Sequence, residues 1–240
     1  GYLALGKSGN AAAITVSNAL AIKGNIDIWG AAVIANSNLS TTAASAGNIT
    51  VVASGAYSGA GTMDANGSIS VTALSFSGTG NFTSAGASGI LVNSTGGDTT
   101  IATNMISNGS TAPITFKATG NIINSAAKTM QSNGGPIVFW TNTAGGTNSY
   151  VSIYAGSTVN SVNGDTTRTS TGGGDIIIGG GNNTGNYPTG PVLSNNTASA
   201  AFSSGTGGTA ASVTTYYSGG GNINFNVKQT AVAQCMSFKY

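Results

Sequence analysis

The residues of this chain whose types suit acid–base chemistry are its five aspartates. The sequence contains no glutamate and no histidine, and the aspartates are Asp27, Asp64, Asp98, Asp165 and Asp175. Enzymes that cleave polysaccharides need two carboxylates close together, or a carboxylate beside a strong base or an arginine. The sequence shows no such pair, and Asp98, Asp165 and Asp175 follow glycines in predicted turns, where turn chemistry explains them. We therefore expect no catalytic residues.

Other motifs match known ligand sites only in part. The run at 172–178 contains Gly-Gly-Gly-Asp, but calcium-binding β-rolls need Gly-Gly-x-Gly-x-Asp in tandem, so that successive turns share each ion. The stretch 205–210 fits Gly-x-Gly-x-x-Ala without the strand and helix of a dinucleotide site, and 125–128 fits Ser-x-x-Lys without its partner motifs. We expect no metal and no cofactor. Cys235 is the single cysteine, and we expect it to be buried or to form an intermolecular bond.

Aromatic residues are the remaining candidates for ligand binding. Trp29, Phe139 and Trp140 lie at the ends of predicted strands, where they can form an exposed platform for sugars. The alternative, which we favour, is that they are core residues or stack on neighbouring coils. The seven lysines and arginines are scattered and form no basic stripe, so nucleic acid is not an expected partner.

The composition predicts an all-β protein with an uncharged surface. Charged residues make up 5 % of the 240 positions, and Gly, Ser, Thr, Asn and Ala fill the polar ones. The residues that usually form the exposed faces of helices are scarce, while glycine and β-branched residues are abundant. The hydrophobic content of 40 % is enough to bury a core.

A repeated motif organises these strands. Six times a glycine is followed, after one residue, by Ile-x-(Ile, Val or Phe), at Gly24, Gly47, Gly67, Gly135, Gly174 and Gly221. A turn glycine that begins a short strand with alternating apolar residues is typical of a stacked β architecture. The chain is therefore predicted to form a β-solenoid, or parallel β-helix, with irregular loops.

The spacing of the motif predicts coils of about 20 residues. On this basis the later spacings, 39 residues from Gly135 to Gly174 and 47 from Gly174 to Gly221, are expected to contain two turns each. The rod would then have roughly ten to twelve coils and a length on the order of 50 Å. Asn residues that follow the turn glycines, such as Asn25 and Asn48, are expected to form ladders along the axis in which side-chain amide bonds to side-chain amide.

Three regions follow from this pattern. Residues 1–181 form the β-helix repeat region, 182–220 an irregular Gly/Ser/Thr-rich loop or insertion, and 221–240 a terminal β coil. The stretch 179–191, with many glycines and two prolines, is expected to leave the rod as a long loop. No apolar run is long enough for a membrane helix, so no membrane insertion is expected. The chain begins without Met or an intact signal peptide, and we interpret it as a mature piece of a longer polypeptide.

The segment at 114–181, with Ile-Thr-Phe, Gly-Asn-Ile-Ile, Gly-Gly-Pro-Ile-Val-Phe-Trp and Gly-Gly-Gly-Asp-Ile-Ile-Ile, resembles repeats of filamentous-haemagglutinin-like adhesins. It is most similar to those in the giant surface proteins of Bacteroidetes. The resemblance implies a right-handed β-helix at the bacterial cell surface, exported by a secretion machinery and sometimes linked to gliding. The two-partner motif Asn-Pro-Asn-Gly-Ile is absent, so a type IX route stays open. The resemblance also implies O-glycosylation at Thr99 and Thr166, which follow aspartate.

The expected function is that of a non-enzymatic, extracellular adhesin or stalk segment of a very large secreted protein. Its expected partner is a cell-surface or substratum glycan or protein, contacted by the loops at 141–149 and 179–191. One alternative is a self-assembling filament or surface-layer subunit that associates end to end. A polysaccharide-cleaving β-helix enzyme and an ice-binding solenoid rank below it, because carboxylate pairs and regular Thr-x-Thr ladders are missing.

Overall fold

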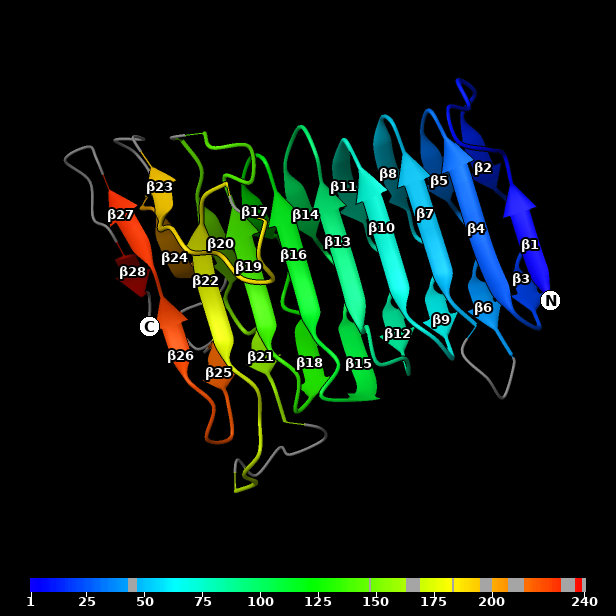
Figure 1. Cartoon of the computed structure of the whole chain (residues 1–240). Coiled ribbons are helices and arrows are strands. Elements are labelled where there is room, and N and C mark those ends of the chain that lie inside the picture. Colours follow the sequence, from blue (N-terminus) through cyan, green and yellow to red (C-terminus); the bar gives the residue numbers. More distant parts are fainter. Residues whose placement is uncertain are drawn as a thin grey trace.

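A computed structural model of the chain shows an elongated rod made of β-strands (Figure 1). It describes residues 1–42, 47–146, 148–162, 169–182, 184–194, 200–206, 214–229 and 236–238, and no helix occurs among them. The strands pair in parallel between successive coils and build three long sheets, which we call A, B and C. The prediction of an all-β parallel β-helix is confirmed.

The three sheets share one order, in which each coil contributes one strand to A, then B, then C. Sheet A has nine strands, β1 (Tyr2–Leu5), β4 (Asn25–Gly30), β7 (Ile49–Ala53), β10 (Ile69–Ala73), β13 (Ile90–Ser94), β16 (Ile114–Ala118), β19 (Ile137–Thr141), β22 (Ile176–Gly180) and β26 (Ile223–Phe225). Sheet B has nine, β2 (Ile14–Val16), β5 (Val33–Ala35), β8 (Ala56–Gly59), β11 (Ser75–Gly78), β14 (Thr99–Ile101), β17 (Ile122–Asn124), β20 (Val151–Tyr154), β24 (Phe202–Thr206) and β28 (Met236–Phe238).

Sheet C has eight strands, β3 (Leu20–Ile22), β6 (Leu39–Thr41), β9 (Met63–Ala65), β12 (Phe82–Ser84), β15 (Met105–Ser110), β18 (Thr129–Asn133), β21 (Thr158–Asn160) and β25 (Thr215–Tyr217). A short extra pair joins β23 (Val192–Ser194) to β27 (Val227–Gln229). In Figure 1 the chain runs up sheet A at the front, turns back into sheet B, returns through sheet C and advances to the left. This course is right-handed, as parallel crossovers nearly always are.

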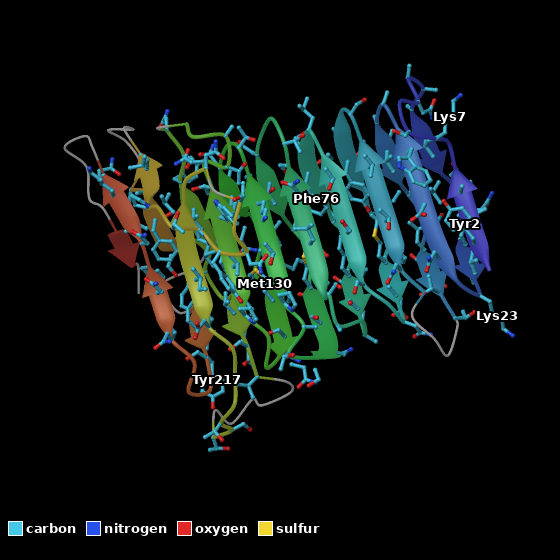
Figure 2. The ribbon with its side chains drawn as sticks, viewed as in Figure 1. Tyr2, Lys7, Lys23, Phe76, Met130 and Tyr217 are labelled. Atoms are coloured by element: carbon cyan, nitrogen blue, oxygen red, sulfur yellow. The ribbon has the colours of Figure 1, made fainter. Side chains whose placement is uncertain are left out.

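One column of isoleucines forms the spine of the core. Paired positions of sheet A hold Ile26, Ile49, Ile69, Ile90, Ile114, Ile137, Ile176 and Ile223. All are buried except Ile223, which lies in the last coil and is 42 % exposed. All six glycine motifs begin strands of this sheet, so the repeat found in the sequence is the register of sheet A. The other sheets face this column with mixed residues, including the stacked rings of Tyr57 and Phe76 and the buried Met130. Figure 2 shows Phe76 and Met130 within the rod, and Lys7 and Lys23 at its first coils.

The prediction of two turns in each of the later spacings is wrong. β19 pairs directly with β22, and β22 pairs directly with β26, so each spacing is a single coil with long loops. Sheet A therefore has nine strands rather than ten to twelve, and the rod is about 40 Å long at a strand spacing of ~4.8 Å. The described residues of 182–220 include β23, β24 and β25, and those of 221–240 include β26, β27 and β28.

Side-chain oxygens at the corners link successive coils. The Oδ1 atom of Asn25 accepts the N–H of Asn48 at 3.0 Å, and the Oδ1 atom of Asn48 accepts the N–H of Ser68 at 2.8 Å. Asn81 and Asn121 make the same bond to the next coil, to Asn104 and Tyr150. The ladder expected from the sequence is present, but it joins side-chain oxygens to main-chain N–H groups rather than amide to amide.

Candidate binding face on sheet A

The outer face of sheet A forms a strip of mostly uncharged side chains along the rod. Strand register sets two outward rows, one with Asp27, Thr50, Ser70, Leu91, Thr115 and Val138, and one with Trp29, Val52, Thr72, Asn93, Lys117 and Trp140. Alternate residues of a strand point to opposite faces, so both rows lie opposite the isoleucine column. The strip offers hydroxyl and amide groups along most of its length, whereas Val138 and Trp140 on β19 are buried.

The loop at 181–191 folds back over this strip, and the prediction that 179–191 leaves the rod is wrong. The indole Nε1 of Trp140 donates to the carbonyl of Gly181 at 2.7 Å, and Gly180 and Gly190 exchange two main-chain bonds. A Cβ at Gly179 would lie 2.9 Å from Cγ of Pro188, so the absence of a side chain there permits close contact. Figure 1 shows the loop crossing in front of β19. Trp140 points outward but is only 1 % exposed.

The loop after β19 lies beside this one. The N–H of Gly181 donates to the carbonyl of Thr141, and the N–H of Ser149 donates to the carbonyl of Leu193 at 2.7 Å. Asn142 adopts a positive φ of 57° at the turn out of β19. The structure therefore brings together the two loops that the sequence marks as contact points, at one corner of the rod.

A groove of about 380 Å³ lies next to the loop, on the coils of β13, β16 and β19. It is lined by Ala87, Ser88, Ile90, Leu91, Thr111, Pro113, Thr115, Lys117, Pro136, Asn186 and Tyr187. The side chain of Tyr187 is 46 % exposed, and the Nζ atom of Lys117 lies 4.3 Å from the centroid of the Trp140 ring. Partial burial lowers the pKa of Lys117, because the ammonium loses hydration there.

The corner that borders this groove departs from a pattern found at five others. Before five strands of sheet A, a hydroxyl donates to the carbonyl of a turn glycine, in the pairs Thr41–Gly47, Ser84–Gly89, Ser132–Gly135, Ser161–Gly174 and Ser218–Gly221. Ser107 occupies the paired position between Ser84 and Ser132, but its buried Oγ has no hydrogen-bond partner. The strand register shifts between Ser107 and Ser110, and Thr111 adopts a φ of 55°.

This corner is strained for a physical reason. A β-branched residue at positive φ is unfavourable by roughly 1–2 kcal/mol, and a buried hydroxyl without a partner adds a further cost. The sequence has Ala112-Pro113 where the other corners have a turn glycine. The Ser/Thr–Gly corners were missed in the sequence, although a hydroxyl residue before the turn glycine is a visible signal.

A second groove of about 570 Å³ lies on the same face near the first coils. Its lining includes Ser8, Asn10, Trp29, Val52 and Thr72. Asn10 closes one side, because its Nδ2 donates to the carbonyl of Trp29 at 3.0 Å. Trp29 is half-buried, so this groove also combines an aromatic ring with hydroxyl groups.

The proposed aromatic platform does not form as a single surface. Phe139 points inward and stacks on Phe116 with ring centroids 5.2 Å apart, Trp140 lies under the loop, and Trp29 lies on β4, five strands away from β19 in sheet A. The favoured alternative therefore holds for Phe139.

The aspartates that the structure describes lie on different elements. The Oδ1 atoms of Asp98 and Asp175 accept the N–H groups of Asn121 and Asn222 at 2.7 and 2.8 Å, so these two belong to the axial ladder. Asp27 lies in sheet A and Asp64 in sheet C. Within the described part of the chain no cluster of three or more His, Cys, Asp or Glu residues is found. Asp165, Thr166, Arg168 and Cys235 lie outside the described residues.

Thr99 is not accessible to a glycosylating enzyme in the folded rod. It is 0 % exposed in the core column of sheet B, and its Oγ1 lies 2.7 Å from the hydroxyl of Ser94. The aspartate–threonine pattern gave no sign of this, since strand alternation turns Thr99 inward and Thr100 outward. In the ranges that the structure describes, no helix is long and apolar enough to cross a bilayer.

The stacked sheets define the class of this protein as a parallel β-solenoid. No protein-family model, curated protein or solved structure matches the chain. The class therefore comes from the fold itself.

Proposed function

We propose that this chain is a segment of a non-enzymatic adhesin, in which a rigid rod carries a binding face on sheet A. One observation carries the proposal. The loops at 141–149 and 181–191, from two successive coils, meet at one corner, and the second of them walls a groove, while the core column beneath them continues without interruption. Loops of variable length on a rigid scaffold are the usual location of binding residues.

The low charge of the chain supports this role. Stacked strands and axial hydrogen bonds hold the coils together, and 5 % charged residues leave little stability dependent on ion pairs that salt would screen. Asp98 and Asp175 are engaged in main-chain hydrogen bonds between coils, which supports a structural rather than a catalytic role for them. An extracellular location at a bacterial surface, export by a secretion machinery and a link to gliding belong to the same proposal and rest on the resemblance of 114–181.

Attachment of particles coated with the purified chain tests the proposal. Beads carrying the whole chain are applied to candidate surfaces, namely glycan-coated, protein-coated and bare substrata. A variant in which a short turn replaces 182–189 removes the wall of the groove, and its secondary structure and melting temperature show whether the rod is intact. We expect the native beads to adhere to at least one coated surface and the variant beads to detach. Equal adhesion of both, or of neither, contradicts the proposal.

A filament subunit is the second candidate, and the first coil favours it. Leu5, Ile14 and Leu20 pack on the core but stay only half-buried, and Tyr2 is 61 % exposed. A further coil, from the same polypeptide or from a second copy, would cover these side chains and pair with β1. Electron microscopy of the purified chain distinguishes the two, since a filament subunit forms fibres whereas an adhesin segment stays as short rods.

A further inference from the structure

The groove beside the loop at 181–191 combines three kinds of group that together recognise a charged sugar. Its lining supplies the aromatic ring of Tyr187, the hydroxyls of Ser88, Thr111 and Thr115, the amide of Asn186 and the ammonium of Lys117. We propose that this groove binds an anionic saccharide, whose sugar ring carries a carboxylate or a sulfate. The inference rests on the proposed attachment function and names the ligand class and the residues that bind it.

Lys117 provides the charge selectivity. Its Nζ lies 4.3 Å from the centroid of the Trp140 ring, Trp140 is held by its bond to Gly181, and Lys117 lines the groove. The lining contains no aspartate or glutamate. Partial burial removes hydration from the ammonium of Lys117 and so lowers its pKa. An anionic group of a ligand would restore favourable interactions to this charge.

The remaining lining fits a sugar ring. The exposed ring of Tyr187 offers an apolar face for the C–H groups of a saccharide, and hydroxyl and amide groups around it are donors and acceptors for sugar hydroxyls. The volume of about 380 Å³ lies within the range of small-molecule sites, about 300–1,000 Å³.

The strained corner is an independent observation at the same place. Thr111 has a positive φ of 55° and lines the groove, and the unpartnered Oγ of Ser107 lies in the strand that leads to it. Local strain in an otherwise regular repeat occurs most often where function requires it. Here the strain places the exposed side chain of Thr111 at the rim of the groove.

Other classes of ligand fit this groove less well. Nucleic acid requires several phosphate contacts, whereas Lys117 is the one cation among the lining residues. A peptide that binds as an added strand needs an open sheet edge, but β13, β16 and β19 are each paired on both sides in sheet A.

Calorimetric titration of the whole chain with three probes tests the inference. The probes are an oligogalacturonate for the carboxylate, a heparin oligosaccharide for the sulfate and a neutral cello-oligosaccharide. We expect one or both anionic probes to bind and the neutral probe to bind at least tenfold more weakly, because a hydrogen bond to a charged group is among the strong ones. The anionic probe that binds identifies the anion. Absence of binding by both anionic probes, or equal binding of the neutral one, overturns the inference.

Matched substitutions locate the site. Lys117→Met keeps an unbranched apolar stem against Trp140 and removes the charge, whereas Lys23→Met removes an exposed lysine of the first coils. Tyr187→Ala removes the ring at the groove, whereas Tyr2→Ala removes an exposed ring elsewhere. We expect about tenfold weaker binding for each groove variant and an unchanged affinity for each control. Unchanged affinity in both groove variants, with melting temperatures showing that they are folded, overturns the assignment of the groove.

The bead assay separates this inference from the proposed function. Beads that adhere equally with native chain and with Lys117→Met refute the anionic-saccharide site and leave the attachment function standing. Probe binding that depends on Lys117, together with beads that adhere to no surface, supports the anionic-saccharide site and refutes the attachment function.

Discussion

Replacement of Tyr57 by phenylalanine is expected to stabilise the rod. Tyr57 is 0 % exposed in the core column of sheet B, its ring stacks on Phe76 with centroids 5.2 Å apart, and its hydroxyl has no hydrogen-bond partner. Burying a hydroxyl without a partner costs about 1–3 kcal/mol in proteins. Tyr57→Phe keeps the stack and removes this cost, so the free energy of unfolding should rise by about 1–2 kcal/mol.

Thermal and denaturant unfolding of the two proteins measure this change. For a chain of this length each kcal/mol corresponds to about 2–4 °C, so the melting temperature should rise by about 2–8 °C. Tyr216→Phe is the matched control, because the hydroxyl of Tyr216 bonds to Ser204 at 3.0 Å and its loss should destabilise by about 1 kcal/mol. A Tyr57→Phe variant that is less stable than the native chain would refute the reasoning, since the hydroxyl would then have a stabilising partner.

The pH dependence of the same variant provides a second check. Burial raises the pKa of Tyr57 above its usual value of 10.0, so the unfolded chain loses this proton from about pH 10 while the native chain keeps it. Ionisation of Tyr57 therefore leaves the free energy of unfolding unchanged below pH 10 and lowers it above pH 10, by up to about 1.4 kcal/mol per pH unit. The advantage of Tyr57→Phe should therefore grow as the pH rises above 10. An advantage that is constant from pH 8 to pH 11 would contradict the burial of this hydroxyl.

Four further predictions concern individual residues. Ile69→Ala removes a buried member of the isoleucine column and should lower the free energy of unfolding by about 2–5 kcal/mol in denaturant titrations. Asn48→Ala removes the acceptor for the N–H of Ser68 and should cost about 0.5–1.5 kcal/mol, with faster hydrogen exchange at that amide. Thr111→Gly relieves a positive φ and should leave the melting temperature equal or higher, whereas a clear drop would show that this residue is not strained. Mass spectrometry of the chain isolated from its native source should find Thr99 unmodified, and a glycan there would contradict its burial.

The sequence predicts sheet A better than the rest of the rod. Six of its nine strands begin with the motif of a turn glycine and an isoleucine, because the tight corner needs small residues and the column behind it selects one side-chain shape. Sheet B has no such signal, since its paired positions run from Val33 through Tyr57 and Phe76 to Thr99 and rely on complementary volume between neighbouring coils. Residue types at single positions do not reveal such compensation.

Spacing was a poor guide to the number of coils. A gap of 39 or 47 residues fits two short coils or one coil with long loops, and only the pairing of β19 with β22 and of β22 with β26 separates these cases. The groove was not predictable for a related reason. Glycine and proline at 179–191 indicate a loop, but its path depends on the contacts of Gly179 with Pro188 and of Trp140 with Gly181.

The proposed binding face requires that the loop at 181–191 lies on sheet A and walls the groove. The chain has two tryptophans, so a Trp29→Phe variant reports on Trp140 alone. Acrylamide quenching of its fluorescence measures whether the indole is covered. We expect blue-shifted emission with weak quenching, and strong quenching when a short turn replaces 182–189. Red-shifted emission that acrylamide quenches fully in the intact loop would show that the loop leaves the rod and that no walled groove exists.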